Sequence, residues 1–461
     1  MATRVARDSM GTVAVPETAL YGAQTQRAVD NFHFSSRRMP AAFIRRLALL
    51  KAACASANAA LGLLDDKRAQ AIVVAARTIA AGEHADQFPV DVFQTGSGTS
   101  TNMNMNEVLA TLAGADVHAN DHVNMSQSSN DVIPSCLQFS TVLELEQDLL
   151  PALDALVALI RERAAGLGTV IKTGRTHLMD AMPLSLGQEL DTWAVQLAEN
   201  AARVRATLGD LRLLPLGGTA IGTGVNCPPS FAERTVEELS ALVYNNHSDG
   251  NSRFGVAPNR ASRMASQDVS VACSGALRVL AVTQMKIAND LRWMGSGPLA
   301  GLGEITLRPL QPGSSIMPGK VNPVLPEAVA MIAAEIIGND VSLGVAGQSG
   351  NFQLNVMLPL FTDKLLGGIA LLARACDALG ATIRDFEVRG ERLAAALDRN
   401  PILATALNTH IGYDKAAAIA KRAYAEGRPI LEVALEDSGL PRAELERLLD
   451  PARLARPAAE D

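Results

Sequence analysis

Three long apolar segments constrain the fold of this 461-residue chain more than any other feature. They run from Ala265 to Met294, from Pro326 to about Val345, and from Leu358 to about Phe386. In each of them the apolar residues surround the whole helix, so the helix must be buried on several sides. Two further segments, Val142–Ile160 and Leu190–Leu208, have apolar residues three or four positions apart, which is typical of amphipathic helices.

Five long helices separated by loops rich in glycine and proline predict a central bundle that shares its helices with other subunits. Hydrophobic residues make up 48% of the chain and aromatic residues only 4%, so alanine and leucine must fill the core. We therefore expect an all-α fold, with an elongated subunit in three parts. The expected parts are a mostly helical N-terminal domain with polar loops (residues 1–134), a five-helix bundle (135–390) and a small helical C-terminal domain (391–461).

Charge and cysteine content exclude several classes of protein. The chain has 41 basic and 48 acidic residues, and no run of Lys and Arg alternates with aromatic residues, so we expect no nucleic-acid partner. The five cysteines are far apart and form no CxxC motif, which indicates a reducing compartment. The N-terminus lacks an apolar signal segment, and we find no uncharged apolar run of about 18 residues. We predict a cytoplasmic protein without a membrane partner.

Two polar loops in the N-terminal third are candidates for binding an anion. The first reads QTGSGTSTNMNMNEV from Gln94, and its glycines and hydroxyls stand just before a predicted helix, although a solvated loop has the same composition. The second reads HANDHVNMSQSSNDVIP from His118, and its four polar residues from Ser128 exceed the need for one helix cap. We expect Pro134 in the first turn of the helix that follows.

Two more polar loops lie in the central part. In IKTGRTHLMDAMPLSLGQEL the polar run from Thr173 to His177 is expected to precede a helix beginning near Pro183. His177 suits proton transfer near neutral pH, but a lone histidine is also often structural. The loop PGSSIMPGKVNP, from Pro312, combines Ser-Ser, Lys and Asn between glycines and prolines, which favours a mobile flap over a plain linker.

These segments resemble the signature blocks of the fumarase and aspartase superfamily, and most closely class II fumarate hydratase. The likeness rests on GSSIMPGKVNP, TGSGTSTNMNMNEV and NMSQSSND, and extends from DSMGTVAVPETALYGAQTQRAV through GRTHLMDA, LGGTAIGTGVN and KIANDLRWMGSGP to LNTHIGYDKAA, about nine tenths of the chain. The resemblance implies a hydro-lyase that adds water reversibly to fumarate to give malate, without a metal or other cofactor. It also implies a homotetramer in which loops of three subunits form each active site.

Carried over by position, the resemblance assigns Ser314 as the base that removes the C3 proton of malate. Lys320 and Asn322, with Ser315 and the backbone at Val321, would bind the doubly charged carboxylate that forms. His177, paired with Glu327, would handle the departing hydroxide as water. Further residues would hold the substrate, namely Ser97, Gly98, Thr99, Ser128, Ser129, Asn130 and Thr176. A secondary anion site would comprise His118, Ala119, Asn120 and Asp121.

The sequence leaves alternatives open. Aspartate ammonia-lyases resemble GRTQ where this chain reads GRTH, so His177 favours the hydratase, whereas Gln353 replaces the Glu usual in fumarases. In the secondary anion site, Ala119 stands where a proline is usual in the family. Ala261 and Ser262 replace a usual aromatic residue and a Glu, which leaves open a hydratase of a substituted fumarate. An inactive scaffold protein is a further alternative that the intact Ser314 and His177 argue against.

Overall fold

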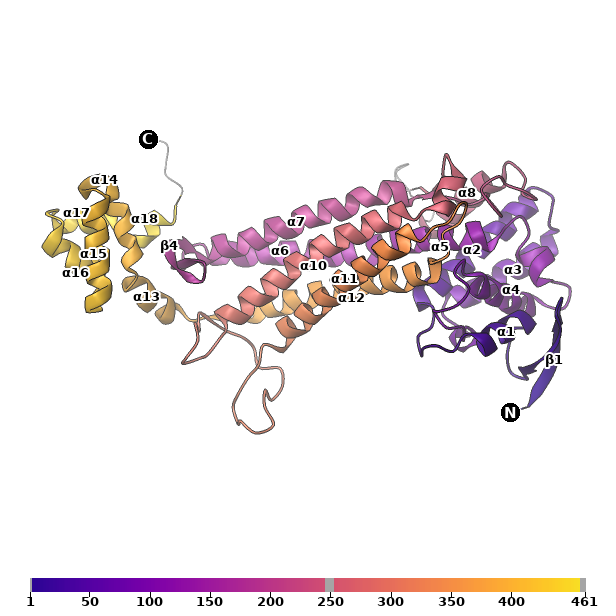
Figure 1. Ribbon diagram of the computed structural model, residues 1–461, viewed down its shortest axis with the longest axis horizontal. Helices are drawn as coiled ribbons and strands as arrows, with labels where there is room; N and C mark the ends of the chain where they lie inside the picture. Colours follow the sequence, from indigo (N-terminus) through magenta and orange to yellow (C-terminus); the bar gives the residue numbers. More distant parts are fainter. Residues whose placement is uncertain (1, 245–252, 457–461) are drawn as a thin grey trace. The chain divides into compact units, whose positions relative to one another are not determined.

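Helices dominate the computed structural model, which describes residues 2–244 and 253–456 (Figure 1). Strands in the described ranges form only two-stranded sheets. The predicted all-α fold is therefore confirmed. The chain divides into two compact units, which are described separately. Unit 1 comprises Met1–Pro151, Ala202–Ala281 and Ala334–Ala373, and unit 2 comprises Ala152–Ala201, Val282–Ala333 and Arg374–Asp461.

Five long helices contribute residues to both units, and they correspond to the five apolar segments predicted from the sequence. The first continues directly from a shorter helix, α5 (Ser129–Glu144), through a π-helical turn, η3 (Leu145–Leu149). The five helices are α6 (Leu150–Gly166), α7 (Leu186–Leu211), α10 (Asp268–Met294), α11 (Val324–Gln348) and α12 (Leu358–Asp385).

Large apolar side chains on these helices are exposed in a single chain. On α11 the exposed fractions of Met331, Val341 and Val345 are 69%, 64% and 54%. In the described part of the chain, length and composition alone would allow α10, α11 and α12 to cross a membrane. The sequence expectation concerned an uncharged run of about 18 residues, which is a stricter criterion, because each of these helices contains charged residues.

Unit 1 is built around α2 (Ala41–Ala60), which buries 12 of its 20 residues, including Phe43, Leu47 and Leu50. This helix packs against α3, α5 and α8. An N-terminal hairpin that the sequence analysis did not predict pairs Thr3 with Pro16 and Asp8 with Gly11. The other elements of the unit are β1 (Thr3–Asp8), β2 (Gly11–Pro16), α1 (Ala23–Asn31), α2 (Ala41–Ala60), α3 (Asp66–Ala80), η1 (Ala85–Gln87), α4 (Thr99–Ala113), η2 (Ala119–Val123), β5 (Leu213–Leu214), α8 (Phe231–Tyr244), β6 (Gly255–Val256) and α9 (Arg260–Ala265).

Unit 2 contains a β-hairpin where the sequence predicted a loop and the start of a helix. Strands β3 (Ile171–Thr176) and β4 (Met179–Ser185) pair antiparallel, and Pro183 pairs with Thr173. Helix α7 therefore starts at Leu186, later than predicted. A proline is tolerated here because β4 has only one neighbouring strand, so its missing N–H leaves no second ladder incomplete.

A buried cluster of charges fixes this hairpin to the rest of unit 2. The ammonium of Lys172 on β3 lies 2.5 Å from Glu189 and 2.7 Å from Glu304, and its side chain is only 1% exposed. Arg175, also on β3, forms an ion pair with the other oxygen of Glu304. Glu304 thus binds two cations of one strand, which stabilises the strand that ends at Thr176, directly before His177.

The C-terminal part of unit 2 consists of short helices around a small apolar core that includes Leu407, Ile419, Val433 and Leu445. On its surface, Arg422 and Arg428 form ion pairs with the acidic residues of α15 and α16. The elements are β7 (Ile305–Thr306), β8 (Glu387–Val388), α13 (Gly390–Asp398), η4 (Pro401–Leu407), α14 (Asn408–Ile411), α15 (Tyr413–Glu426), α16 (Ile430–Asp437), α17 (Arg442–Leu448) and α18 (Pro451–Leu454).

The charge cluster generates a prediction for Glu304→Gln. This change leaves Lys172 buried with only one carboxylate, so we expect the free energy of unfolding to fall by about 3 kcal/mol. Urea denaturation at fixed protein concentration measures it. Asp116→Asn, which removes the exposed ion pair with Lys67, is the control and should cost less than about 1 kcal/mol. Equal midpoints for the two variants would show that the cluster does not stabilise the hairpin.

A close backbone contact before α4 generates a second prediction. A Cβ atom on Gly96 would lie 1.8 Å from the carbonyl oxygen of Val356, so the two segments must separate in Gly96→Ala. We expect a loss of about 2 kcal/mol and a lower melting temperature by calorimetry. In Gly209→Ala, at an exposed helical position with open space around it, alanine should instead raise stability slightly. The same melting temperature for Gly96→Ala and the unaltered chain would contradict this reading of the contact.

Candidate functional site

The first predicted loop ends where α4 begins. Gly98 is the N-cap of this helix with φ of +72°, a left-handed conformation that favours glycine. The hydroxyls of Ser97 and Thr99 are hydrogen-bonded to each other at 2.8 Å, with Ser97 buried and Thr99 partly exposed. Since one hydroxyl must donate to the other, one proton of the pair remains for a bound anion at the positive end of the helix.

The second predicted loop is the capped start of α5. The hydroxyl of Ser128 accepts from the backbone N–H of Asn130 at 3.2 Å, and the backbone N–H of Ser128 donates to Asp131 at 2.9 Å. This capping box starts the helix at Ser129. Pro134 therefore lies inside the helix and not in its first turn as predicted, because the cap is formed further upstream.

Asp131 connects the second loop to the segment LGGTAIGTG. Its carboxylate is fully buried and accepts from the backbone N–H groups of Gly217 and Thr219 at 2.9 and 3.0 Å. Burial raises the pKa of Asp131 to about 6, while these backbone donors and the nearby Lys51 act in the opposite direction. The amide of Asn130 donates to the carbonyl of Ala220 at 2.9 Å, so both residues hold the loop in one position.

The two loops of unit 1 lie together. The amide of Asn102 on α4 donates to the hydroxyl of Ser129 on α5 at 3.1 Å, and Gly98 lies against Ile133. The structure therefore brings the hydroxyls of the first loop close to the polar start of α5, although they are about thirty residues apart in the sequence.

The predicted secondary anion segment lines a pocket of about 480 Å³ in unit 1. His118, Ala119 and Asn120 line it. Asp121 does not line the pocket, and its carboxylate lies 3.0 Å from the ring nitrogen Nδ1 of His118. Arg4 and Arg7 on the N-terminal hairpin also line this pocket. Neither arginine was predicted as a site residue, because the hairpin that brings them to this segment was not predicted.

His177 lies at the tip of the β3–β4 hairpin in unit 2. Thr176 pairs with Met179, so His177 and Leu178 form a two-residue turn, with φ of +56° and +61°. Left-handed backbone at two successive non-glycine residues is costly and is typical of functional positions. Both side chains are exposed, and the ion cluster at Lys172, Arg175 and Glu304 holds the strand below them.

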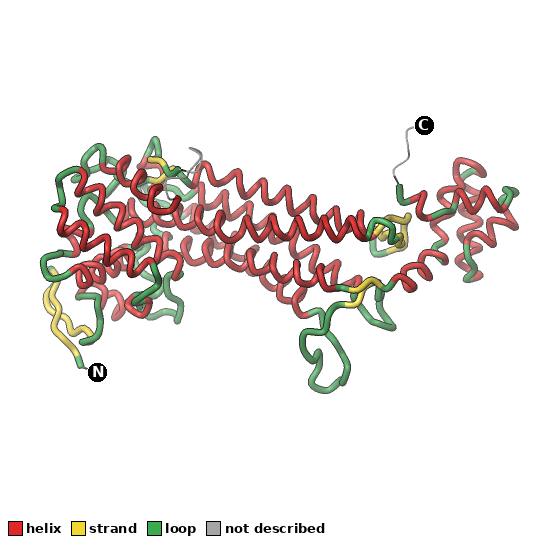
Figure 2. Tube along the Cα trace, turned by 180° about the vertical axis from the view of Figure 1, so that it is seen from behind, coloured by secondary structure: helices red, strands yellow, loops and turns green. Residues whose placement is uncertain are grey.

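The predicted flap is the long loop between β7 and α11, which stands away from the neighbouring helices (Figures 1 and 2). Two hydrogen bonds close its neck. The backbone N–H of Gly313 donates to the carbonyl of Lys320 at 2.8 Å, and the amide of Asn322 donates to the carbonyl of Gly313 at 2.6 Å. A Cβ atom on Gly313 would lie 2.3 Å from that Lys320 oxygen, so only glycine fits.

Within the flap, the hydroxyl oxygen of Ser314 is surrounded by backbone donors. Its hydroxyl oxygen accepts from the backbone N–H groups of Ile316 and Met317, at 3.2 and 3.0 Å. Donors aimed at an oxygen stabilise it more when it is negatively charged, so this arrangement favours a deprotonated serine. A serine held in this way is suited to act as a base.

The other flap residues are placed for access and not for internal contacts. Ser315, Lys320 and Val321 are exposed, and Glu327 is partly buried in the first turn of α11. In the described part of the chain, no hydrogen bond or ion pair joins His177 to Glu327 or to Ser314. Unit 2 on its own therefore does not assemble the predicted catalytic pair.

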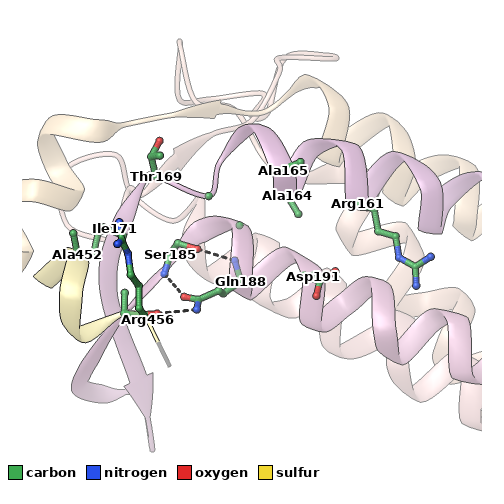
Figure 3. A pocket seen from close by; sticks show the side chains of 13 residues that line it. Arg161, Ala164, Ala165, Thr169, Ile171, Ser185, Gln188, Asp191, Ala452 and Arg456 are labelled. Carbon is green, nitrogen blue, oxygen red and sulfur yellow. Dashed lines mark hydrogen bonds between the residues drawn. The ribbon is translucent and has the colours of Figure 1, made fainter. Parts of the chain in front are cut away.

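A further pocket in unit 2, of about 550 Å³, contains none of the predicted site residues (Figure 3). It lies beside the start of α7, where Ser185 and Gln188 form reciprocal hydrogen bonds of 2.7 and 3.0 Å that cap the helix. Gln188 also donates to the carbonyl of Ala455 at 2.8 Å. These contacts are explained by helix capping and by attachment of the C-terminal segment.

The residues that depart from the family pattern lie in different places. Ala261 contacts Gly222, which belongs to the same segment that holds Asn130 and Asp131. The backbone N–H of Ser262 donates to the side-chain oxygen of the helix cap Asn259, and Gln353 is exposed in a turn. Of these departures, only Ala261 supports a loop that carries predicted site residues.

Comparisons with known proteins identify the family. A lyase family model matches residues 11–338, and the model of the fumarase C C-terminus matches residues 403–456. The chain is 56% identical to a class II fumarate hydratase of Pseudomonas aeruginosa over 98% of both chains, and 47% identical to that of Mycobacterium tuberculosis over 98% and 96%.

Solved structures agree with these relatives. The class II fumarase of Schistosoma mansoni has a TM-score of 0.95 at 35% identity, covering 99% of this chain and 100% of that one. A fumarate lyase:delta crystallin structure of Brucella melitensis bound to cobalt has a TM-score of 0.92 at 42% identity, with coverage of 99% and 100%. With full-length relatives this similar and the signature loops in place, the chain belongs to the class II fumarate hydratase family.

Proposed function

We propose that this fumarate hydratase uses Ser314 as its base in the reversible hydration of fumarate to malate. The reaction follows from membership of the family. The observation that carries the role of Ser314 is the pair of backbone N–H groups on its hydroxyl oxygen. Each hydrogen bond to a charged oxygen is worth about 1.5–3 kcal/mol, so two of them substantially lower the cost of ionising a serine.

In the direction from malate, the Ser314 alkoxide takes the proton from C3, and the electron pair moves into the adjacent carboxylate. That carboxylate then has two negative charges, and Lys320 is the exposed cation in the flap that would balance them. One N–H of the Asn322 amide closes the flap neck, which leaves its second N–H for the substrate. The hydroxyl of Ser315 and the backbone N–H of Val321 would complete this half of the binding site.

The hydroxide at C2 then leaves and is protonated to water. We assign this proton transfer to His177 and Glu327 through a bound water molecule, with Thr176 next to the substrate. Because the two residues do not meet within unit 2, the pairing requires different subunits of one assembly. In the hydration direction the same groups deprotonate water, and Ser314 returns its proton to C3.

The remaining carboxylate would be bound by unit 1. The hydroxyl pair of Ser97 and Thr99, with Gly98 at the cap, stands beside the capped start of α5. Ser128, Ser129 and Asn130 are fixed there by hydrogen bonds to protein atoms.

A secondary anion site at residues 118–121 is supported by the pocket that Arg4 and Arg7 also line. The guanidinium groups of Arg4 and Arg7 would attract an anion there. Asp8 and Glu107 share the lining, but their carboxylates are bound to Arg27 and to the backbone N–H of Gly22. For the whole chain we retain a three-part division, with boundaries near residues 134 and 390.

We also propose a cytoplasmic homotetramer without nucleic acid or membrane. The exposed apolar side chains of α11 support this proposal, because an apolar surface of this kind is unfavourable in water unless another protein surface covers it. The same surface would be the shared helical core of the assembly, and the division of the catalytic residues between loops requires one.

A prediction about the base concerns Ser314→Ala. Removing the base should lower kcat by at least about a thousandfold while KM changes little, because the carboxylate-binding groups remain. Formation of fumarate from malate, followed by ultraviolet absorbance, measures both constants. Gln311→Ala, at an exposed position of the same loop with no proposed part in binding, should retain normal turnover.

Aspartate is tested as a substrate in parallel. Formation of fumarate from aspartate and not from malate would contradict the hydratase assignment. Near-normal turnover of malate by Ser314→Ala would remove only the assignment of the base.

Another prediction concerns assembly of the subunits. Met331→Glu with Val341→Glu places charges on the apolar face of α11, and burying them in an interface is unfavourable. We expect light scattering to show about four times the chain mass of 48.5 kDa for the unaltered protein and a smaller species for the variant, with loss of activity. Val5→Glu, at an exposed valine of the N-terminal hairpin, should leave the mass unchanged. A fully active monomer would disprove the shared active site.

A further inference from the structure

A buried lysine lies behind the capped start of α5 and has no part in the mechanism above. Lys51 on α2 has no exposed surface. Its ammonium donates to the side-chain oxygens of Asn124 at 3.1 Å and Gln127 at 2.8 Å. In the described ranges no carboxylate forms an ion pair with it, and burial lowers the pKa of Lys51 to about 8, although the nearby charge of Asp131 acts in the opposite direction. Keeping an ammonium buried without a direct ion pair is costly, which calls for a reason beyond packing.

The ammonium determines how the neighbouring amides are oriented. An ammonium only donates, so the oxygen of Asn124 must face Lys51, while the nitrogen of Asn124 donates to the carbonyl of Gln127 at 3.2 Å. The oxygen of Asn124 in turn requires donors on its other sides. Asn102 and Asn106 provide them, with their amide nitrogens 3.0 and 3.1 Å away.

The same donor-to-acceptor direction of hydrogen bonding extends to Ser129. Because one N–H of Asn102 is directed at Asn124, its second N–H is directed at the hydroxyl oxygen of Ser129, at 3.1 Å. Ser129 therefore accepts from the protein, and within the described residues its hydroxyl forms no bond as a donor. Its proton is left for a ligand. The oxygen of Asn102 is buried without a partner, so a rotated amide would instead offer Ser129 an acceptor inside the protein.

We propose that Lys51 is a positioning residue that sets the direction of the hydrogen bonds through Asn124 and Asn102, so that the hydroxyl of Ser129 donates to a substrate carboxylate. This inference rests on the proposed binding of a carboxylate by Ser129. Without the ammonium, only the carbonyl of Gln127 orients the amide of Asn124. When Asn124 rotates, the amide of Asn102 follows, and the proton of Ser129 turns inward to the oxygen of Asn102. The carboxylate then loses one donor.

The test uses the full-length enzyme and succinate, a dicarboxylate that cannot react. In Lys51→Met, a side chain of similar length without a donor, the dissociation constant for succinate by calorimetry should rise on the order of tenfold. KM for malate should rise by a similar factor, with kcat changing much less, because the base and the acid are elsewhere. Asn102→Asp puts an acceptor in place of the amide nitrogen that faces Ser129, so the hydroxyl of Ser129 should donate inward and succinate binding should weaken similarly. This variant provides the test if Lys51→Met does not fold.

A double-mutant cycle separates this role from general damage to the fold. Ser129→Ala removes the hydroxyl on which Lys51 is proposed to act, so adding Lys51→Met to it should change the dissociation constant by less than about twofold. Leu50→Ala, at the adjacent buried position of α2, destabilises the helix without touching the amides and should bind succinate normally.

The outcomes are distinct. Succinate binding unaffected by both Lys51→Met and Asn102→Asp, factors that multiply in the double variant, or equal weakening by Leu50→Ala would each overturn the positioning role. If Ser129→Ala alone binds succinate normally, the assignment of Ser129 in the proposed function is wrong, and the inference fails with it.

Discussion

The buried carboxylate of Asp131 is the contact on which the architecture of unit 1 depends. It caps α5 through the N–H of Ser128 and accepts from Gly217 and Thr219, which belong to a distant part of the sequence. A carboxylate without these donors could not remain charged at a fully buried position. One side chain thus starts a helix, fixes the hydroxyls before it and ties down the segment that holds Asn130. The small residue Ala261 belongs to the same arrangement, because it packs against Gly222 in that segment.

The chemistry is divided according to what each unit can stabilise. In the proposed mechanism, unit 1 would bind one carboxylate through neutral hydroxyl and backbone N–H donors at helix starts. Unit 2 would supply the groups that exchange protons, on a strained hairpin and on a loop. The hairpin is held by Glu304, and the loop by bonds across its own neck. In both cases fixed contacts adjoin the proposed catalytic side chain, which would reduce the reorganisation needed during the reaction.

Sequence patterns predicted the long helices because apolar periodicity over twenty residues is a strong local signal. The signature loops predicted the family and the positions of Ser314 and His177. The β3–β4 hairpin was not predicted, since its turn is His177-Leu178 and lacks the Asn-Gly or Asp-Gly pair that marks such turns. The chain of hydrogen bonds from Lys51 to Ser129 could not be predicted either, and neither could the pocket that Arg4 and His118 both line. Both depend on side-chain contacts between residues that are far apart in the sequence.

The bonds across the neck of the flap have a consequence for how the enzyme meets its substrate. Ser314 and both of its N–H donors lie between Gly313 and Lys320, so they move together whenever the loop moves. In the proposed mechanism, both donors to Ser314 are therefore in place before the substrate binds. A movement of the loop would change only the distance from the hydroxyl oxygen to the carbon acid, because the donors travel with it.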